Sequence, residues 1–176
     1  MNKIKTLIFD LDGVLVDTKN IHFDSLNFAL KKIVKKQITF KDHLNIFDGL
    51  PTLKKLTILN KKKIFDKKYN SEIIKIKNEK TEDLLKKNIR FNKKIYEAFS
   101  ILSKKYNICI ATNAVKKTLD ICINKLRIKK FLSSSLSNED VKNNKPHPEI
   151  YLQILINTDS KPSEAIIFED SHYGVL

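Results

Sequence analysis

Two carboxylates follow the first apolar run of the chain, within residues 9–13, Phe-Asp-Leu-Asp-Gly. A carboxylate can act as a nucleophile and take up a phosphoryl group as a mixed anhydride. A second carboxylate two residues later can protonate the leaving oxygen and then activate a water molecule. A calcium-binding loop is excluded because Val14 stands where a third oxygen ligand belongs. On its own the pair could be a simple turn, but behind an apolar strand it also suits phosphoryl transfer, with Asp10 as the nucleophile and Asp12 as the acid and base.

Three further polar groups have the chemistry that phosphoryl transfer requires. Thr112 and Asn113 follow a second apolar run, Lys145 lies in a proline-flanked segment, and Glu169 and Asp170 follow the last apolar run. A hydroxyl, an amide and a lysine can hold phosphate oxygens, whereas carboxylates suit Mg²⁺, which offsets the charge of a dianionic phosphate. Taken one at a time, these groups have simpler explanations: Thr112 or Glu169 could cap a helix, and Lys145 is one of many lysines.

Short apolar runs position these groups, and they alternate with helical patterns. The runs indicate buried strands at residues 4–9, 106–112 and 165–168 and a weaker strand at residues 131–135. The helical periodicity covers residues 92–105, 115–126 and 148–156. This alternation predicts an α/β fold with a Rossmann-like parallel sheet and helices on both faces. Because the carboxyl ends of parallel strands share one edge, we expect Asp10, Thr112 and Glu169 to meet in one crevice.

The segment between the first and second strands has a different pattern. It contains helical stretches at residues 19–35, 52–59 and 64–85, and nothing in it is typical of a strand. We therefore predict two domains, a core formed by residues 1–16 and 89–176 and an inserted helical domain formed by residues 17–88.

The four polar motifs together resemble those of the haloacid dehalogenase-like hydrolases. Residues 9–18 are similar to the first motif of that family, and residues 111–113 to the second. Lys-Pro-x-Pro-Glu at residues 145–149 resembles the third motif, and residues 168–174 resemble the fourth. All four occur in order over essentially the whole chain. The helical insert looks like the small cap of phosphoglycolate phosphatase and β-phosphoglucomutase relatives.

The resemblance implies a role for each group. It implies that Asp10 is the nucleophile, that Asp12 is the acid and base, and that Thr112, Asn113 and Lys145 bind the phosphate. It also implies a Mg²⁺ cofactor held by Asp10, the Asp12 carbonyl and Asp170, with help from Glu169.

Two residues of the helical insert resemble positions that face the substrate in some relatives. They are His22 and Lys77. The competing interpretation is that His22 has no role and that Lys77 belongs to a solvated helix face. Mutase relatives also carry a cap arginine for a second phosphate, and residues 49–52 contain none.

The resemblance predicts a Mg²⁺-dependent phosphatase that hydrolyses a small phosphorylated metabolite through an aspartyl-phosphate. The absence of the cap arginine favours a phosphatase over the alternative, a phosphomutase. Relatives continue beyond the point that corresponds to Leu176, so we expect one or more C-terminal strands to be missing. A truncated, inactive binding protein is therefore a third hypothesis.

Composition excludes other classes of protein. The formal net charge is +14, but only Arg90 and Arg127 are arginines, which argues against nucleic-acid recognition. The cysteines, Cys109 and Cys122, form no metal-binding or redox motif. We expect no signal peptide, and no apolar stretch approaches the ~18 residues of a membrane span. We expect a cytoplasmic protein, a monomer, with no membrane partner.

Overall fold

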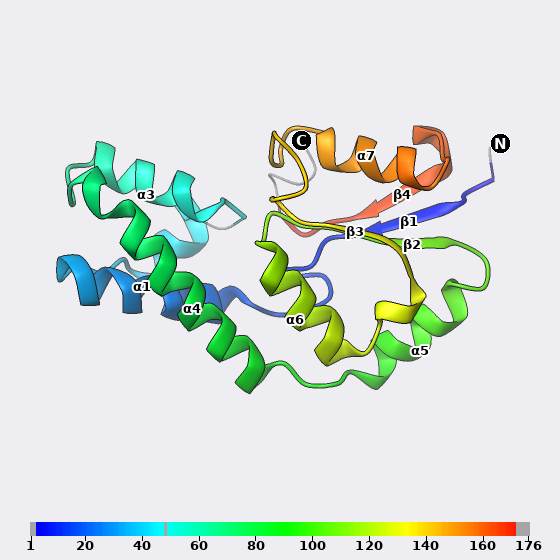
Figure 1. Cartoon of the computed structure of the whole chain (residues 1–176), viewed down its shortest axis with the longest axis horizontal. Coiled ribbons are helices and arrows are strands. Elements are labelled where there is room, and N and C mark those ends of the chain that lie inside the picture. Colours follow the sequence, from blue (N-terminus) through cyan, green and yellow to red (C-terminus); the bar gives the residue numbers. More distant parts are fainter. Residues whose placement is uncertain (1–2, 48, 172–176) are drawn as a thin grey trace. The chain divides into compact units, whose positions relative to one another are not determined.

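The computed structural model describes residues 3–47 and 49–171 of the chain (Figure 1). It divides into two compact units, one formed by residues 1–17 and 89–176 and the other by residues 18–88. The first unit is built on the four strands β1 (Thr6–Phe9), β2 (Asn107–Ala111), β3 (Leu132–Leu136) and β4 (Ala165–Phe168). All pairings are parallel, in the order β3-β2-β1-β4. The predicted α/β fold with a parallel sheet is confirmed.

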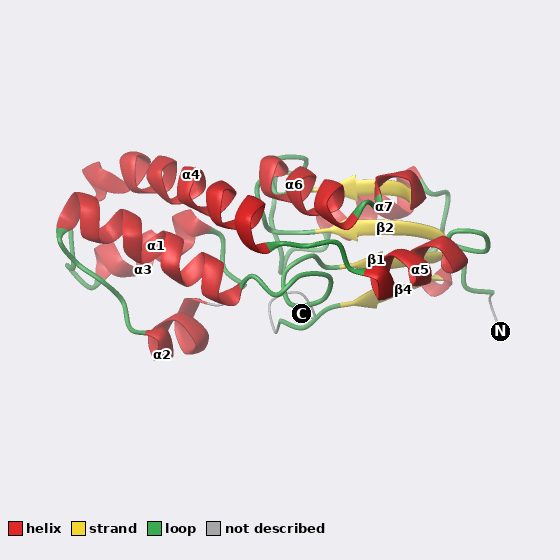
Figure 2. Ribbon diagram, turned by 90° about the horizontal axis from the view of Figure 1, so that it is seen from below, coloured by secondary structure: helices red, strands yellow, loops and turns green. Residues whose placement is uncertain are grey.

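Helices cover both faces of this sheet. Figure 1 shows α7 (Glu149–Asn157) on one face, and α5 (Lys93–Leu102) and α6 (Lys116–Leu126) on the opposite face, an arrangement also visible in Figure 2. Short 3₁₀ turns at Lys129–Phe131 and Pro162–Glu164 lead into β3 and β4. Strands buried on both faces need apolar residues at every position, which explains the continuous apolar runs of β1 and β2.

The side chains on the two faces of β1 pack in two different layers of the core. Ile8 packs with Ile150 and Ile154 of α7, whereas the ring of Phe9 lies 5.1 Å from the ring of Phe99 on α5. This division follows from the alternation of side chains along a strand. Strand β1 therefore packs between two layers, and this packing fixes the position of the next residue, Asp10.

Strand β4 is less covered than the other strands. It pairs with β1, and Ile166, Ile167 and Phe168 are 40–44% exposed. Phe168 stacks on Phe9 with ring centroids 4.5 Å apart. The pairing and the stacking fix the end of β4 beside the end of β1.

The second unit is helical in the residues described. It contains α1 (Lys19–Val34), α2 (Phe40–Asp42), a π-helical turn (His43–Phe47), α3 (Thr52–Lys61), a 3₁₀ turn (Lys67–Tyr69) and α4 (Asn70–Asn88). Its core is made of buried apolar side chains, namely Leu26, Ala29, Leu30, Phe47, Leu56, Leu59 and Ile73. The sequence did not predict α2 or the turn after it, because three residues are too few to show a helical period.

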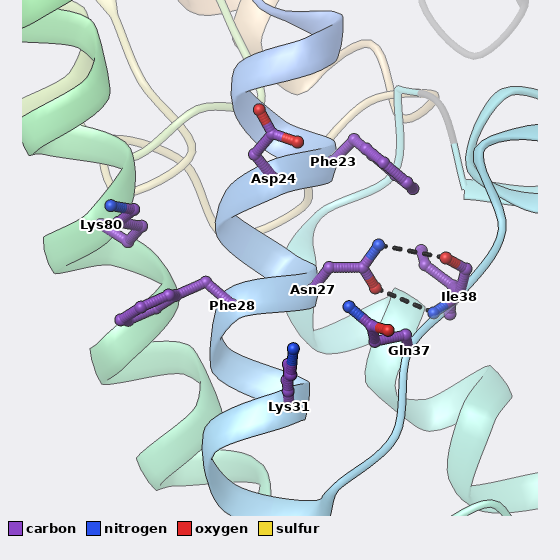
Figure 3. Close-up of a pocket in the computed structure, with 8 residues that line it drawn as sticks. All are labelled: Phe23, Asp24, Asn27, Phe28, Lys31, Gln37, Ile38 and Lys80. Carbon is purple, nitrogen blue, oxygen red and sulfur yellow. Dashed lines mark hydrogen bonds between the residues drawn. The ribbon is translucent and has the colours of Figure 1, made fainter.

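A pocket of about 390 Å³ lies in the helical unit (Figure 3). It is lined by Phe23, Asp24, Asn27, Phe28, Lys31, Gln37, Ile38 and Lys80. The Asn27 amide donates to the Ile38 carbonyl at 3.0 Å and accepts from the Ile38 N–H at 2.8 Å. These bonds tie the segment after α1 to the helix itself.

In residues 3–47 and 49–171 every helix is too short or too polar to cross a membrane.

Candidate active site

The ends of the two central strands, β1 and β2, place two polar groups at one edge of the sheet. Asp10 follows β1, and its N–H donates to the Phe168 carbonyl of β4 at 2.9 Å. Thr112 follows β2, and its N–H donates to the Leu136 carbonyl of β3 at 3.0 Å. The sheet ladder thus extends one residue beyond the strands. Asp10 and Thr112 are both buried, as predicted for groups at one sheet edge.

The ammonium group of Lys145 lies between the ends of β1, β2 and β4 and contacts a residue at each of them. It is 3% exposed and donates to Asp10 Oδ1 at 2.7 Å, to Glu169 Oε2 at 2.7 Å and to the Ala111 carbonyl at 2.8 Å. A lysine has three N–H donors, so each of them is used. Two carboxylates next to one buried cation offset the cost of removing that cation from water.

These contacts set the charge states of the three groups. Burial is the main reason why the pKa of Asp10 is raised to about 7. Lys145 lowers this pKa, whereas the charges of Glu169 and Asp12 raise it. Burial opposes the charge of Lys145, but Asp10, Tyr151 and Glu169 outweigh it and raise the pKa of that lysine. Burial also raises the pKa of Glu169, but Lys145 and the hydrogen bonds from Ser171 outweigh this effect and lower the pKa overall. At neutral pH Lys145 and Glu169 are therefore ionised, and Asp10 is the carboxyl poised between its two forms.

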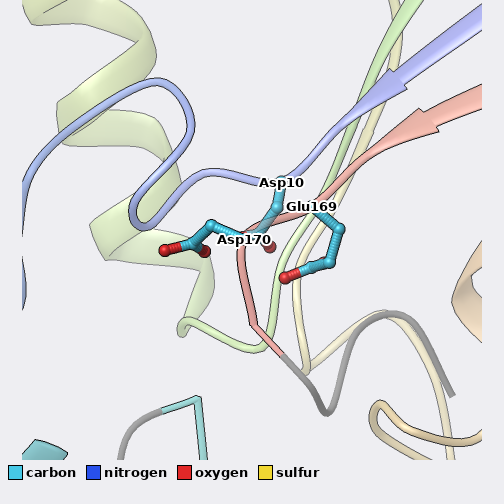
Figure 4. Close-up of side chains that lie close together, drawn as sticks. All are labelled: Asp10, Glu169 and Asp170. Atoms are coloured by element: carbon cyan, nitrogen blue, oxygen red, sulfur yellow. The ribbon is translucent and has the colours of Figure 1, made fainter.

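Three carboxylates form a candidate metal site at the ends of β1 and β4. Asp10, Glu169 and Asp170 each have one carboxylate oxygen that lies within 4.8 Å of the corresponding oxygens of the other two residues (Figure 4). Carboxylate oxygens are the hard ligands that Mg²⁺ prefers. The donor set therefore fits the predicted ion.

Gly13 is required for this arrangement. Its φ is +87°, and a Cβ built on it would overlap the Asp170 carboxylate. The turn also includes a bond from the Gly13 N–H to the Val16 carbonyl at 2.8 Å. Asp12, between Asp10 and Gly13, is half-buried, and its charge contributes to the raised pKa of Asp10. The turn thus brings Asp12 into electrostatic contact with Asp10 and leaves room for Asp170.

The model of the haloacid dehalogenase-like hydrolase family matches residues 7–176. The chain belongs to this family. The predicted family is therefore confirmed.

Relatives of this hydrolase chain include named phosphatases. A phosphorylated carbohydrates phosphatase from Thermotoga maritima is 30% identical over 179 residues, which cover 98% of this chain and 79% of the relative. The pyrophosphatase PpaX of Bacillus cereus (strain Q1) is 27% identical, with 99% and 78% covered.

Solved structures of hydrolase relatives share the fold. The β-phosphoglucomutase of Clostridium difficile has a TM-score of 0.80 at 25% identity, covering 98% of this chain and 78% of that one. CbbY of Rhodobacter sphaeroides, in complex with phosphate, has a TM-score of 0.85 at 18% identity, with 98% and 80% covered.

Four of the predicted residues of this hydrolase, Asp10, Lys145, Glu169 and Asp170, lie together, and Asn113 makes contacts that the sequence did not predict. The Asn113 side chain accepts from the Lys145 N–H at 3.0 Å and donates to the Lys145 carbonyl at 3.3 Å. Thr112 Oγ1 accepts from the Ala114 N–H at 3.0 Å. Asn113 thus holds the backbone that carries Lys145, and the phosphate roles of Thr112 and Asn113 stay predictions.

Sequence reasoning missed the groups that hold Glu169. The Tyr151 hydroxyl donates to Glu169 Oε2 at 3.2 Å, and Ser171 donates to Oε1 from its N–H at 3.2 Å and from its hydroxyl at 2.8 Å. Ser171 directly follows the acidic pair, which is a signal for a side chain that folds back on Glu169. Tyr151 carries no such signal, because its contact spans 18 residues.

The remaining predicted residues lie in the helical unit or outside the described part. His22 is on α1 and Lys77 is on α4, both half-buried. Their roles toward a substrate stay predictions. Gly174, the last residue of the fourth motif, lies outside the described residues.

Proposed function

We propose that this chain is a Mg²⁺-dependent phosphatase that hydrolyses a small phosphorylated metabolite through an aspartyl-phosphate on Asp10. One observation carries the proposal: a buried carboxylate at a strand end is bonded to a buried lysine and belongs to a three-carboxylate cluster. The names of the relatives, a phosphatase and a pyrophosphatase, support the same class of reaction.

The first half-reaction transfers the phosphoryl group to the protein. An Asp10 oxygen attacks phosphorus, the bond from phosphorus to the leaving oxygen breaks, and Asp12 gives its proton to that oxygen. In the second half-reaction Asp12 takes a proton from water as the water oxygen attacks phosphorus. The bond between phosphorus and Asp10 breaks, which releases inorganic phosphate and restores both carboxyl groups.

Lys145 binds the transferring phosphoryl group in this proposal. Its three N–H groups already donate to Asp10, Glu169 and the Ala111 carbonyl, so a bond to phosphate must replace one of them. The bond to Asp10 is the one to exchange, because Asp10 gives up negative charge when it bonds to phosphorus. The other two bonds then keep the ammonium in place.

Asp10, the Asp12 carbonyl and Asp170, with Glu169 beside them, would hold Mg²⁺. The ion supplies positive charge that offsets the negative charge of the phosphoryl group and of the attacking carboxylate. Ionised Asp10 is the reactive form, and a cation beside it favours that form over the protonated one, which its raised pKa would otherwise populate at neutral pH.

In this proposal the helical unit recognises the substrate, and His22 and Lys77 are candidate contacts. A phosphomutase is the alternative, because the β-phosphoglucomutase of Clostridium difficile shares the fold. Residues 18–88 contain no arginine, so a bisphosphate would find no bidentate guanidinium partner there. A phosphatase is therefore preferred.

Phosphate release from a panel of sugar phosphates, carboxylic acid phosphates and pyrophosphate tests the proposal. We expect turnover with Mg²⁺, none with EDTA, and a loss of about a thousandfold or more in Asp10→Asn because the nucleophile is removed. Asp120→Asn, at an exposed position on α6, is the matched control and should match wild type. An Asp10→Asn protein with wild-type turnover would refute the mechanism, and transfer of phosphate to a second hydroxyl would favour the mutase.

A further inference from the structure

Tyr151 on α7 contacts two members of the candidate site. Its hydroxyl donates to Glu169 Oε2 at 3.2 Å, and the Lys145 ammonium lies 5.1 Å from the centroid of its ring. The same Glu169 oxygen accepts from Lys145 at 2.7 Å. Tyr151 therefore faces the pair that connects the nucleophile to the acidic cluster.

The Glu169 carboxylate is fixed through both of its oxygens. Oε1 accepts from the Ser171 N–H and hydroxyl, and Oε2 accepts from Lys145 and Tyr151. Ser171 and Glu169 are sequence neighbours at the end of β4, so they move together. Tyr151 instead belongs to a helix that packs on the central strands, with Ile150 and Ile154 buried beside it. Its hydroxyl therefore ties the carboxylate to the rigid core of the unit.

The ring and the hydroxyl of Tyr151 have separable effects. The ring packs against the core cluster under α7 and faces the Lys145 cation, and phenylalanine would preserve both contacts. The hydroxyl bonds to a carboxylate, and a hydrogen bond to a charged group contributes more than a neutral one. A tyrosine that served packing alone would not need its hydroxyl directed at Glu169.

We propose that Tyr151 is a positioning residue whose hydroxyl orients the Glu169 carboxylate, and through it the Lys145 ammonium and the metal-ion site. Without that bond Glu169 rotates more freely about its side-chain torsions, and Lys145 loses a fixed acceptor next to Asp10. The catalytic consequence rests on the proposed phosphatase function, but the effect on metal affinity does not.

The test compares Tyr151→Phe with Tyr96→Phe. Tyr96 on α5 also packs its ring against aromatic neighbours, Phe91 and Phe131, and serves as the matched hydroxyl deletion. For Tyr151→Phe we expect kcat to fall about five- to tenfold with KM within about twofold, since one charge-assisted hydrogen bond is lost and substrate contacts remain. We expect the dissociation constant for Mn²⁺, titrated alone by calorimetry, to rise at least about threefold. Tyr96→Phe should leave kcat, KM and Mn²⁺ affinity at wild-type values.

Each outcome decides the proposal. Wild-type kcat and Mn²⁺ affinity in Tyr151→Phe, or changes equal to those of Tyr96→Phe, would overturn it. The double variant with Glu169→Gln provides a second measurement: if Tyr151 acts through Glu169, adding Tyr151→Phe to Glu169→Gln should change Mn²⁺ affinity little further. Full additivity would refute that route. If the wild type hydrolyses no phosphorylated compound, the proposed function fails, and the Mn²⁺ titrations still decide the role of Tyr151.

Discussion

Gly13→Ala separates backbone strain from the loss of a metal ligand. Gly13 has a φ of +87°, where an L-residue costs about 1–2 kcal/mol. The added methyl group would also overlap the Asp170 carboxylate. That carboxylate is the end of an exposed side chain, so it can rotate away at little cost to stability. We therefore expect a loss of about 1–2 kcal/mol in the free energy of unfolding, all of it from φ.

Metal affinity should change far more than stability. A displaced Asp170 leaves two of the three clustered carboxylates, and we expect the dissociation constant for Mg²⁺ to rise by at least about tenfold. Turnover at limiting Mg²⁺ should fall in proportion, and saturating Mg²⁺ should restore part of it.

Gly49→Ala provides the control for strain. Gly49 has a φ of +70° and belongs to the helical unit. Chemical denaturation should give similar losses of stability for the two variants, while a calorimetric Mg²⁺ titration should show weakened binding for Gly13→Ala alone. In an Asp170→Ala background, Gly13→Ala should have no further effect on affinity. Unchanged Mg²⁺ binding in Gly13→Ala would refute the assignment of Asp170 as a ligand.

Two further substitutions test charged groups, one in the candidate site and one elsewhere in the core unit. Lys145→Met nearly keeps the length of the side chain but leaves Asp10 and Glu169 buried without their cation, so the free energy of unfolding at pH 7 should fall by about 3 kcal/mol and kcat by about a hundredfold or more. The loss of stability should become smaller toward acid pH, because the carboxylates then take up protons. Lys142→Met, at an exposed position in the same segment, is the control and should match wild type. Asp140→Asn removes a carboxylate that accepts hydrogen bonds from the Ser137 N–H and hydroxyl, both at 2.7 Å. Burial raises the pKa of Asp140, but these bonds and Lys116 outweigh burial and lower the pKa overall. The ionised carboxylate therefore stabilises the fold above its ordinary pKa of 3.8, and this stabilisation is lost as the pH falls through the lowered pKa. Thermal unfolding should show a lower Tm for Asp140→Asn at pH 7 and no difference near the acid limit, and a difference that grows toward acid would contradict this assignment.

The sheet and the strand ends could be predicted because they depend on local patterns. A strand buried on both faces must be apolar throughout, and this pattern located β1 and β2 to within two residues at each end. The apolar run of β4 also gave its bounds, but the prediction that this strand is buried is wrong, because β4 lies at the edge of the sheet and its side chains are largely exposed. The serine-rich strand β3 was placed one residue early, because Ser133 and Ser134 carry no apolar signal. Parallel pairing then brings Asp10, Thr112 and Glu169 to one edge whatever the details of the helices.

The support around the site could not be predicted in the same way. The bond from Tyr151 to Glu169 and the two bonds between Asn113 and Lys145 join segments that are distant in the sequence. Side-chain direction on a helix is set by packing, and periodicity does not report whether a tyrosine hydroxyl reaches a carboxylate. Asn113 illustrates the difference: its residue type suggested a phosphate contact, and its amide is used to hold the loop that carries Lys145.

The charge balance of the site explains why a cation belongs there. The chain carries a formal net charge of +14, yet the cluster at the ends of β1 and β4 has four carboxylates, Asp10, Asp12, Glu169 and Asp170, against one lysine. With every carboxylate ionised the cluster would carry three net negative charges, which would repel a phosphate dianion that the rest of the protein attracts. Burial is the main cause of the raised pKa of Asp10, and the charges of Glu169 and Asp12 add to it, so a proton at that position is one way to reduce the excess. A divalent cation reduces it without consuming the nucleophile, so the ion that the cluster fits is also the one that makes Asp10 reactive.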